Sequence, residues 1–173
     1  MGLFTLGIAL HPLNVYFHEH MHAVVIKLLF VNVTPKVVID NLIIGRCEYG
    51  NNSPLELTAI GTFFGMNNAR SLAAATGPIA DILFIALPIF LTKSQTVATL
   101  SLVNAIILSN YAILNPIVSL FNNSENIHGD FARILEKSGV VACVVLSSLS
   151  LAASAYTVKM ACKKQADKIE KFN

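Results

Sequence analysis

Residues 3–30 form the stretch LFTLGIALHPLNVYFHEHMHAVVIKLLF, which is largely apolar yet contains the pattern His-Glu-x-x-His at His18, Glu19 and His22. Residues four apart on a helix lie about 40° from each other around the axis, so they share one face. The two histidines can therefore bind one metal ion, and Glu19 beside them can accept a proton from water. Ionisable side chains are costly at membrane depth, and chains that place them there generally use them. The stretch predicts a metal site inside a membrane.

The composition predicts an integral membrane protein. Of the 173 residues, 54% are hydrophobic and 13% are charged, whereas soluble domains carry about 25% charged residues. The mean hydropathy is +0.64. Four segments are long enough to cross a lipid bilayer, at residues 3–30, 72–91, 95–121 and 138–158. We expect a single-domain, all-α polytopic membrane protein with about four transmembrane helices. The N-terminus has no basic region and no evident cleavage site, so the first span is not expected to be a removable signal peptide.

Charge and cysteine usage exclude several classes of function. The net charge of +2 gives no reason to expect a nucleic-acid partner. The three cysteines, Cys47, Cys143 and Cys162, show no Cys-x-x-Cys spacing, so neither a disulfide framework nor a thiolate metal site is predicted. With four spans, the basic residues divide equally between the two membrane sides, and the positive-inside rule does not decide the orientation.

The segment between the first two spans, at residues 31–70, differs in character from the spans. Residues 37–39 and 42–44 flank Asp40-Asn41 and resemble two short strands joined by a turn. Residues 50–54 then predict a loop. Residues 55–66 are apolar over about a dozen positions, a length that suits an interfacial or re-entrant helix better than a full crossing.

A catalytic zinc site typically has three protein ligands and leaves a fourth position open, so a third ligand is needed besides the two histidines. Asp130 and Asp81 are the leading acids. His11 shares the helical face of His18 but lies about 10 Å along the axis; we expect it to be a polar residue near the membrane surface or a proton-relay group. His20 points away from that face, and His128 is a weaker candidate because it lies two residues before Asp130.

Together these motifs resemble those of the site-2 protease family of intramembrane zinc metalloproteases. The resemblance rests on His18-Glu19-x-x-His22, on Gly77-Pro78 in a later span, and on Gly129-Asp130, and it extends from residue 11 to about residue 136. In that family a Gly-Pro segment packs in the core, and a later Asn-x-x-Pro followed by Asp-Gly supplies an aspartate ligand. This chain departs from the pattern because it has Gly129-Asp130 in reverse order and Asn115-Pro116 adjacent.

The resemblance implies an intramembrane zinc endopeptidase in a minimal form without an accessory domain. It implies that His18, His22 and Asp130 bind one Zn2+ and that Glu19 is the catalytic base. Its substrate would be the transmembrane helix of another membrane protein, unwound locally because an intact helix hides its carbonyls. The site would open toward the cytosol, and the predicted hairpin would correspond to the membrane-edge hairpin of the family.

Three further residues are expected near such a site. Asn110 or Asn115 would hold the unwound substrate or the oxyanion, as the family's asparagine is thought to do. Asp81 lies nine residues into its span, at a depth comparable with the histidines, and is expected to support a ligand if it is not the third ligand itself.

A different class remains open, a metal-binding membrane protein without hydrolysis, such as a metal transporter or a degenerate protease acting as a scaffold. The additional histidines His11, His20 and His128 favour it because they would provide a transit path. Against it, a transporter does not need a glutamate directly after the first histidine. It would also carry ionisable groups on several spans, whereas residues 95–121 and 138–158 have none.

Overall fold

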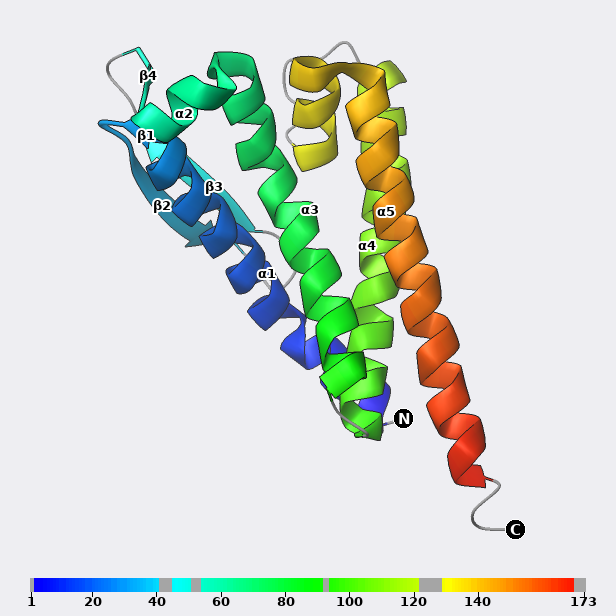
Figure 1. Ribbon diagram of the computed structural model, residues 1–173. Helices are drawn as coiled ribbons and strands as arrows, with labels where there is room; N and C mark the ends of the chain where they lie inside the picture. Colours follow the sequence, from blue (N-terminus) through cyan, green and yellow to red (C-terminus); the bar gives the residue numbers. More distant parts are fainter. Residues whose placement is uncertain (1, 41–44, 51–53, 92–93, 122–128, 170–173) are drawn as a thin grey trace.

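The computed structural model describes residues 2–40, 45–50, 54–91, 94–121 and 129–169. Four long helices dominate it: α1 (Gly2–Leu29), α3 (Met66–Leu91), α4 (Gln95–Phe121) and α5 (Asp130–Ile169). They run alternately in opposite directions, so both ends of the chain lie at the same end of the molecule, and α3 lies between α1 and α5 (Figure 1). The structure therefore has the mostly helical architecture that the composition predicts.

Three helices are long and apolar enough to cross a membrane, over Met66–Ile89, Ser101–Val118 and Asp130–Lys164. The predicted fourth span, α1, is not confirmed. It has 28 residues, which is sufficient length, but the described residues include the histidines, Glu19 and Lys27, which lower its hydropathy. The second span also begins six residues earlier than position 72, because α3 continues without a break from Met66.

Helix α5 folds back on itself at Gly139, which has φ 81° and ψ 177°. The Cys143 thiol donates a hydrogen bond to the carbonyl oxygen of Phe131 over 3.5 Å, although twelve residues of straight helix would separate them by about 18 Å. Figure 1 shows the first turns of α5 running antiparallel to the remainder of the helix. The crossing therefore starts near residue 139, in agreement with the predicted span 138–158.

Replacing Gly139 with alanine is expected to destabilise the fold by about 1–3 kcal/mol, because this backbone conformation is essentially restricted to glycine. No atom lies within 4 Å of a Cβ built at this position, so the cost comes from the backbone alone. A lower midpoint of thermal unfolding in detergent would confirm it. Val140→Ala, at the exposed neighbouring position, is the control and is expected to unfold within about 0.5 kcal/mol of wild type. Equal midpoints for Gly139→Ala and wild type would contradict the prediction.

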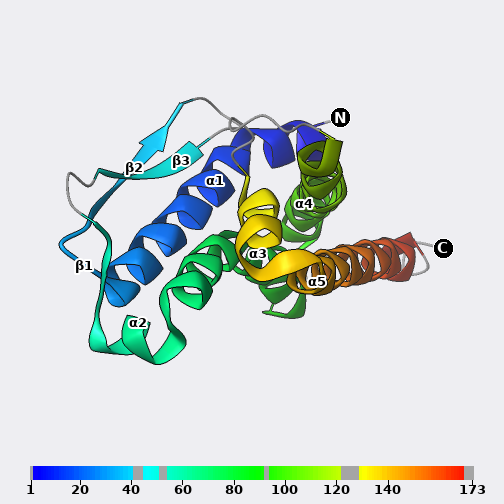
Figure 2. The ribbon, with the colours of Figure 1, turned by 90° about the horizontal axis from the view of Figure 1, so that it is seen from above.

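A β-hairpin follows α1, as predicted. Strands β2 (Thr34–Ile39) and β3 (Gly45–Gly50) pair antiparallel, from Thr34 opposite Gly50 to Ile39 opposite Gly45. The described part of the second strand is Gly45–Gly50, and the predicted strand residues 42–44 lie outside the described residues. Of the predicted loop at 50–54, Gly50 instead ends β3, and residues 51–53 are also outside the described part. Figure 2 shows the hairpin beside α1 on the side away from α5.

The predicted helix at residues 55–66 is wrong in extent. Glu56 and Leu57 form strand β4, which pairs with β1 (Phe30–Val31), and α2 covers only Ala59–Phe64. The helix starts later than predicted because residues 56–57 pair with β1 as a strand. The Thr58 side chain then caps α2 by accepting a hydrogen bond from the Gly61 amide. Gly65, at φ 78°, then separates α2 from α3.

Candidate metal centre

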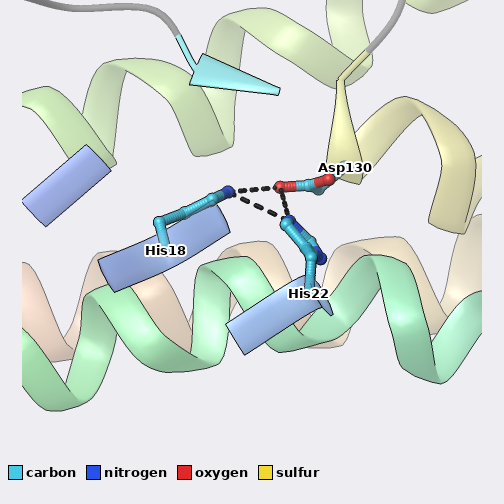
Figure 3. A group of neighbouring side chains, drawn as sticks. All are labelled: His18, His22 and Asp130. Carbon is cyan, nitrogen blue, oxygen red and sulfur yellow. Dashed lines mark hydrogen bonds and ion pairs between the residues drawn. The ribbon is translucent and has the colours of Figure 1, made fainter. Parts of the chain in front are cut away.

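Three side chains from opposite ends of the chain meet at one point. The Nε2 atoms of His18 and His22 lie 3.1 Å apart. One carboxylate oxygen of Asp130, Oδ2, lies 2.9 Å from His18 Nε2 and 3.1 Å from His22 Nε2. Figure 3 shows the two rings projecting from α1 toward Asp130 at the start of α5. All three residues are largely removed from solvent.

The hydrogen bonds of the two Nδ1 atoms determine whether the Nε2 atoms of His18 and His22 carry a proton or a lone pair. His22 Nδ1 lies 2.7 Å from the carbonyl oxygen of Ala73, which only accepts, so Nδ1 carries the proton. His18 Nδ1 lies 2.9 Å from Oδ2 of Asp81, and an ionised carboxylate likewise requires a proton on that nitrogen. In the neutral imidazoles both Nε2 atoms then present lone pairs to each other and to Asp130. Three acceptors converge, an arrangement that a cation between them stabilises.

The spacing fits a zinc ion. With zinc–ligand bonds of about 2.0–2.1 Å, tetrahedral geometry places ligand atoms about 3.3 Å apart, close to the three distances above. Among the described residues, His18, His22 and Asp130 are the one group of this kind whose ligand atoms all lie within 4.8 Å of one another. The resemblance described above implies the same three ligands, whereas the sequence itself left Asp81 as an alternative to Asp130. Asp81 instead bonds the far side of His18, the position that carboxylates commonly occupy behind a metal-binding histidine.

Gly77 on α3 lies directly against the two Nε2 atoms. A Cβ at this position would be 2.3 Å from His18 Nε2 and 2.4 Å from His22 Nε2. Such distances are far below van der Waals contact, so only glycine leaves room there for the ring nitrogens and an ion. The predicted role of Gly77-Pro78 was core packing, and the structure gives its glycine a closer relation to the ligands.

Two residues of α4 fix the position of Asp130. The Tyr111 hydroxyl accepts a hydrogen bond from the Asp130 amide over 3.2 Å, and Asn115 Oδ1 accepts one from the Ala132 amide over 2.9 Å. Gly129 permits this approach, because a Cβ there would lie 2.0 Å from Asn115 Nδ2. Asn115 thus satisfies a free amide at the start of α5 and orients the aspartate, as an N-cap does.

A cavity of about 730 Å³ opens over the three ligands. Glu19 lines it and is buried, with 7% of its surface exposed. Strand β3 forms one wall, and its close approach to α1 depends on Gly45, where a Cβ would be 2.8 Å from Val15 and 2.9 Å from the Glu19 side chain. Burial raises the pKa of the Cys47 thiol in this wall to about 11. A thiol with this pKa is protonated at neutral pH.

The remaining predicted residues lie elsewhere. His11 is buried and its Nδ1 lies 2.8 Å from Asn104 Oδ1, so its surroundings are the helix interface and not a surface. His20 Nδ1 contacts the carbonyl oxygen of Tyr16 within its own helix. The Asn110 side chain is exposed and donates to the carbonyl oxygen of Ile106. The structure does not bring these three to the ligands, and His128 is outside the described residues.

Several residues of the site could not be found from the sequence. Tyr111 and Gly45 carry no motif, and the Ala73 carbonyl is a backbone group. Asn14 donates to Asp81 Oδ1 over 3.1 Å, and its one signal in the sequence is that it is a polar residue within the largely apolar stretch 3–30. Their roles depend on contacts between helices.

Comparison with known proteins adds no relative: no family model, no curated protein and no solved structure matches the chain.

Proposed function

We propose that the protein is an intramembrane zinc metalloprotease that hydrolyses peptide bonds within or near transmembrane helices of other membrane proteins. The observation that carries the proposal is the convergence of His18 Nε2, His22 Nε2 and Asp130 Oδ2 within about 3 Å, in a cavity that Glu19 also lines. In this proposal α1 lies in the membrane as a fourth span, and the cavity opens toward the cytosol.

The roles of the residues follow from their chemistry. When bound by His18, His22 and Asp130, zinc supplies Lewis acidity that polarises a carbonyl and makes water more acidic. Glu19 takes a proton from the attacking water and returns it to the leaving amine. Asp81 holds the His18 ring in the tautomer whose Nε2 faces the ion, and the Ala73 carbonyl does the same for His22.

The walls of the cavity favour a peptide over a free ion as the substrate. Residues 45–48 of β3 line it, and within the described residues β3 pairs with β2 alone. An unwound transmembrane segment needs partners for its exposed amides and carbonyls, and strand addition provides them. A cavity of about 730 Å³ is also far larger than a path for single ions requires.

For metal transport, one form of the alternative function, the described residues offer no second group of metal-binding side chains. His11 and His20 are hydrogen-bonded to Asn104 and to the Tyr16 carbonyl, away from the three ligands. In the part of the chain that the structure describes, His18, His22 and Asp130 form the one candidate group.

Glu19→Gln is expected to lower the rate of peptide cleavage by about 100-fold or more, because loss of a general base typically costs 10²–10⁴-fold. Zinc content is expected to stay at one ion per chain, since Glu19 is not among the three ligands. Cleavage of a membrane-embedded reporter in proteoliposomes, with zinc analysis of the same preparation, measures both quantities. Glu56→Gln, an exposed glutamate on β4 that does not line the cavity, is the matched control. Full cleavage by zinc-loaded Glu19→Gln would refute the mechanism.

A further inference from the structure

The mouth of the cavity is unusually rich in charged side chains for a predominantly apolar protein. Four basic residues and two acidic residues line it: Arg46, Arg70, Arg133, Lys137, Glu48 and Glu136. The basic residues come from three separate parts of the chain, namely β3, the first turns of α3 and the first turns of α5. We call these six residues the charged mouth.

The two acids of the charged mouth are already paired. Arg46 contacts Glu48 at 2.5 Å and Asp40 at 2.6 Å, and Lys137 contacts Glu136. Arg70 and Arg133 have no ion pair with any other described residue. Arginine stays protonated at any physiological pH, so the four cations of the charged mouth exceed Glu48, Glu136 and the Asp40 that pairs with Arg46 by one positive charge.

Three of the four basic residues, Arg70, Arg133 and Lys137, lie on α3 and α5, on the wall opposite β3. The Ser138 hydroxyl donates to the Ser71 hydroxyl, which brings the neighbouring residues Lys137 and Arg70 close together. Arg133 precedes Lys137 by four residues and therefore shares its helical face. Burial raises the pKa of the Cys47 thiol on the facing wall, and the positive charge of Arg133 partly opposes that rise. The wall made by α3 and α5 is thus the positive side of the cavity.

The positive side lies close to the proposed metal. Arg133 follows the ligand Asp130 by three residues, which is a rise of about 4.5 Å along the helix. An extended peptide advances about 3.3 Å per residue, so a substrate side chain a few residues from the cleaved bond reaches Arg133 and Arg70. Over this distance salt screens little, because the Debye length is about 8 Å at physiological ionic strength.

We infer that the charged mouth selects membrane-protein substrates that carry acidic residues, aspartate or glutamate, within a few positions of the cleaved bond, and disfavours substrates with lysine or arginine there. This inference rests on the proposed function, since it specifies the substrate class of the same site. The chemistry is charge complementarity at the rim of the cavity, which favours acidic partners and disfavours basic ones.

Binding of defined peptides to zinc-loaded Glu19→Gln in phosphatidylcholine nanodiscs tests the inference, because this variant holds a substrate without cleaving it. Three synthetic transmembrane peptides share one apolar segment and differ only in four adjoining residues, which are acidic, basic, or serine and asparagine. An exposed ion pair changes affinity by about 2–5-fold, so we expect the acidic peptide to bind about 10-fold or more tightly than the basic one. The difference is expected to shrink at high salt.

Charge variants locate the effect. The double variant Arg70→Gln/Arg133→Gln is expected to bind the acidic peptide about 3–10-fold more weakly. The single variant Arg133→Glu is expected to bind the basic peptide more tightly. Lys27→Gln removes an exposed cation of α1 that does not line this cavity, and it is expected to bind like the parent. Thermal unfolding of each variant confirms that the fold is intact. Equal binding of the acidic and basic peptides, or equal losses in Lys27→Gln, would overturn the inference.

Anionic lipid headgroups share the carboxylate's charge and are a separate outcome. If phosphatidylglycerol nanodiscs abolish the peptide preference, and the arginine variants change lipid binding alone, the mouth binds lipid and the inference is wrong. Cleavage by the wild-type protein is scored separately from peptide binding. Cleavage without charge preference rejects only this inference, whereas charge-selective binding with no cleavage rejects the proposed function.

Discussion

Asp130→Asn is expected to abolish cleavage and to remove nearly all bound zinc, because it replaces one of three ligands with a neutral amide. The carboxylate oxygen lies 2.9 Å and 3.1 Å from the two histidine nitrogens, and Asp130 is 7% exposed. Asp81→Asn is expected to lower zinc affinity by about 10–100-fold, the usual effect of changing a group that orients a ligand. The amide that replaces the Asp81 carboxylate would still offer an oxygen to His18 Nδ1.

Zinc affinity is measured by competition with a chromophoric chelator on purified protein in detergent, alongside cleavage of the membrane reporter. Asp167→Asn, at an exposed position near the end of α5, makes the same chemical change far from the site and is expected to retain both zinc and activity. The opposite order, with Asp81→Asn losing the ion and Asp130→Asn retaining it, would move the third-ligand assignment to Asp81.

Gly77→Ala is expected to remove zinc as effectively as loss of a ligand. The added methyl group would stand 2.3–2.5 Å from ring atoms of His18 and His22, so the rings must leave the positions from which they face Asp130. Overpacking in a tight core typically costs about 1–3 kcal/mol. We therefore expect a folded but less stable protein with little bound metal and no measurable cleavage.

Ile79→Phe is the matched control for this prediction, because it enlarges an exposed side chain two residues along α3, about 200° around the helix. Zinc analysis and thermal unfolding are compared for both variants. Retention of one tightly bound zinc by Gly77→Ala would show that the rings approach the ion from another direction than the described one.

The part of the site that lies on one helix could be predicted from the sequence. His18 and His22 are four residues apart on one helix, so helical geometry alone places both Nε2 atoms on one face, and the structure has them 3.1 Å apart. Asp130 was expected from its place at the start of a helix on the same side, and the structure brings it to the histidines. The apolar segments at 72–91, 95–121 and 138–158 likewise correspond to helices, because length and hydropathy are properties of a segment by itself.

The features that depend on contacts between distant segments could not be predicted from the sequence. The close fit of Gly45 in β3 against Val15 and Glu19 is not encoded in any local pattern. The shortness of α2 follows from the pairing of β4 with β1. The sequence identifies Asn115 as a polar residue in an apolar helix. Its contacts with Gly129 and the amide of Ala132 form only because the start of α5 packs against α4.

The fold-back at Gly139 has a consequence for the order in which the protein becomes functional. His18 and Asp130 are 112 residues apart in the chain, and Phe131 and Ile134, which follow the aspartate, pack against Cys143 and Leu146 beyond Gly139. A chain whose last helix has not yet packed therefore has its two histidines on α1 but lacks part of the packing around the third ligand. In the proposed protease, hydrolytic competence and completed assembly would then coincide, and a partly built chain would not cleave neighbouring membrane proteins.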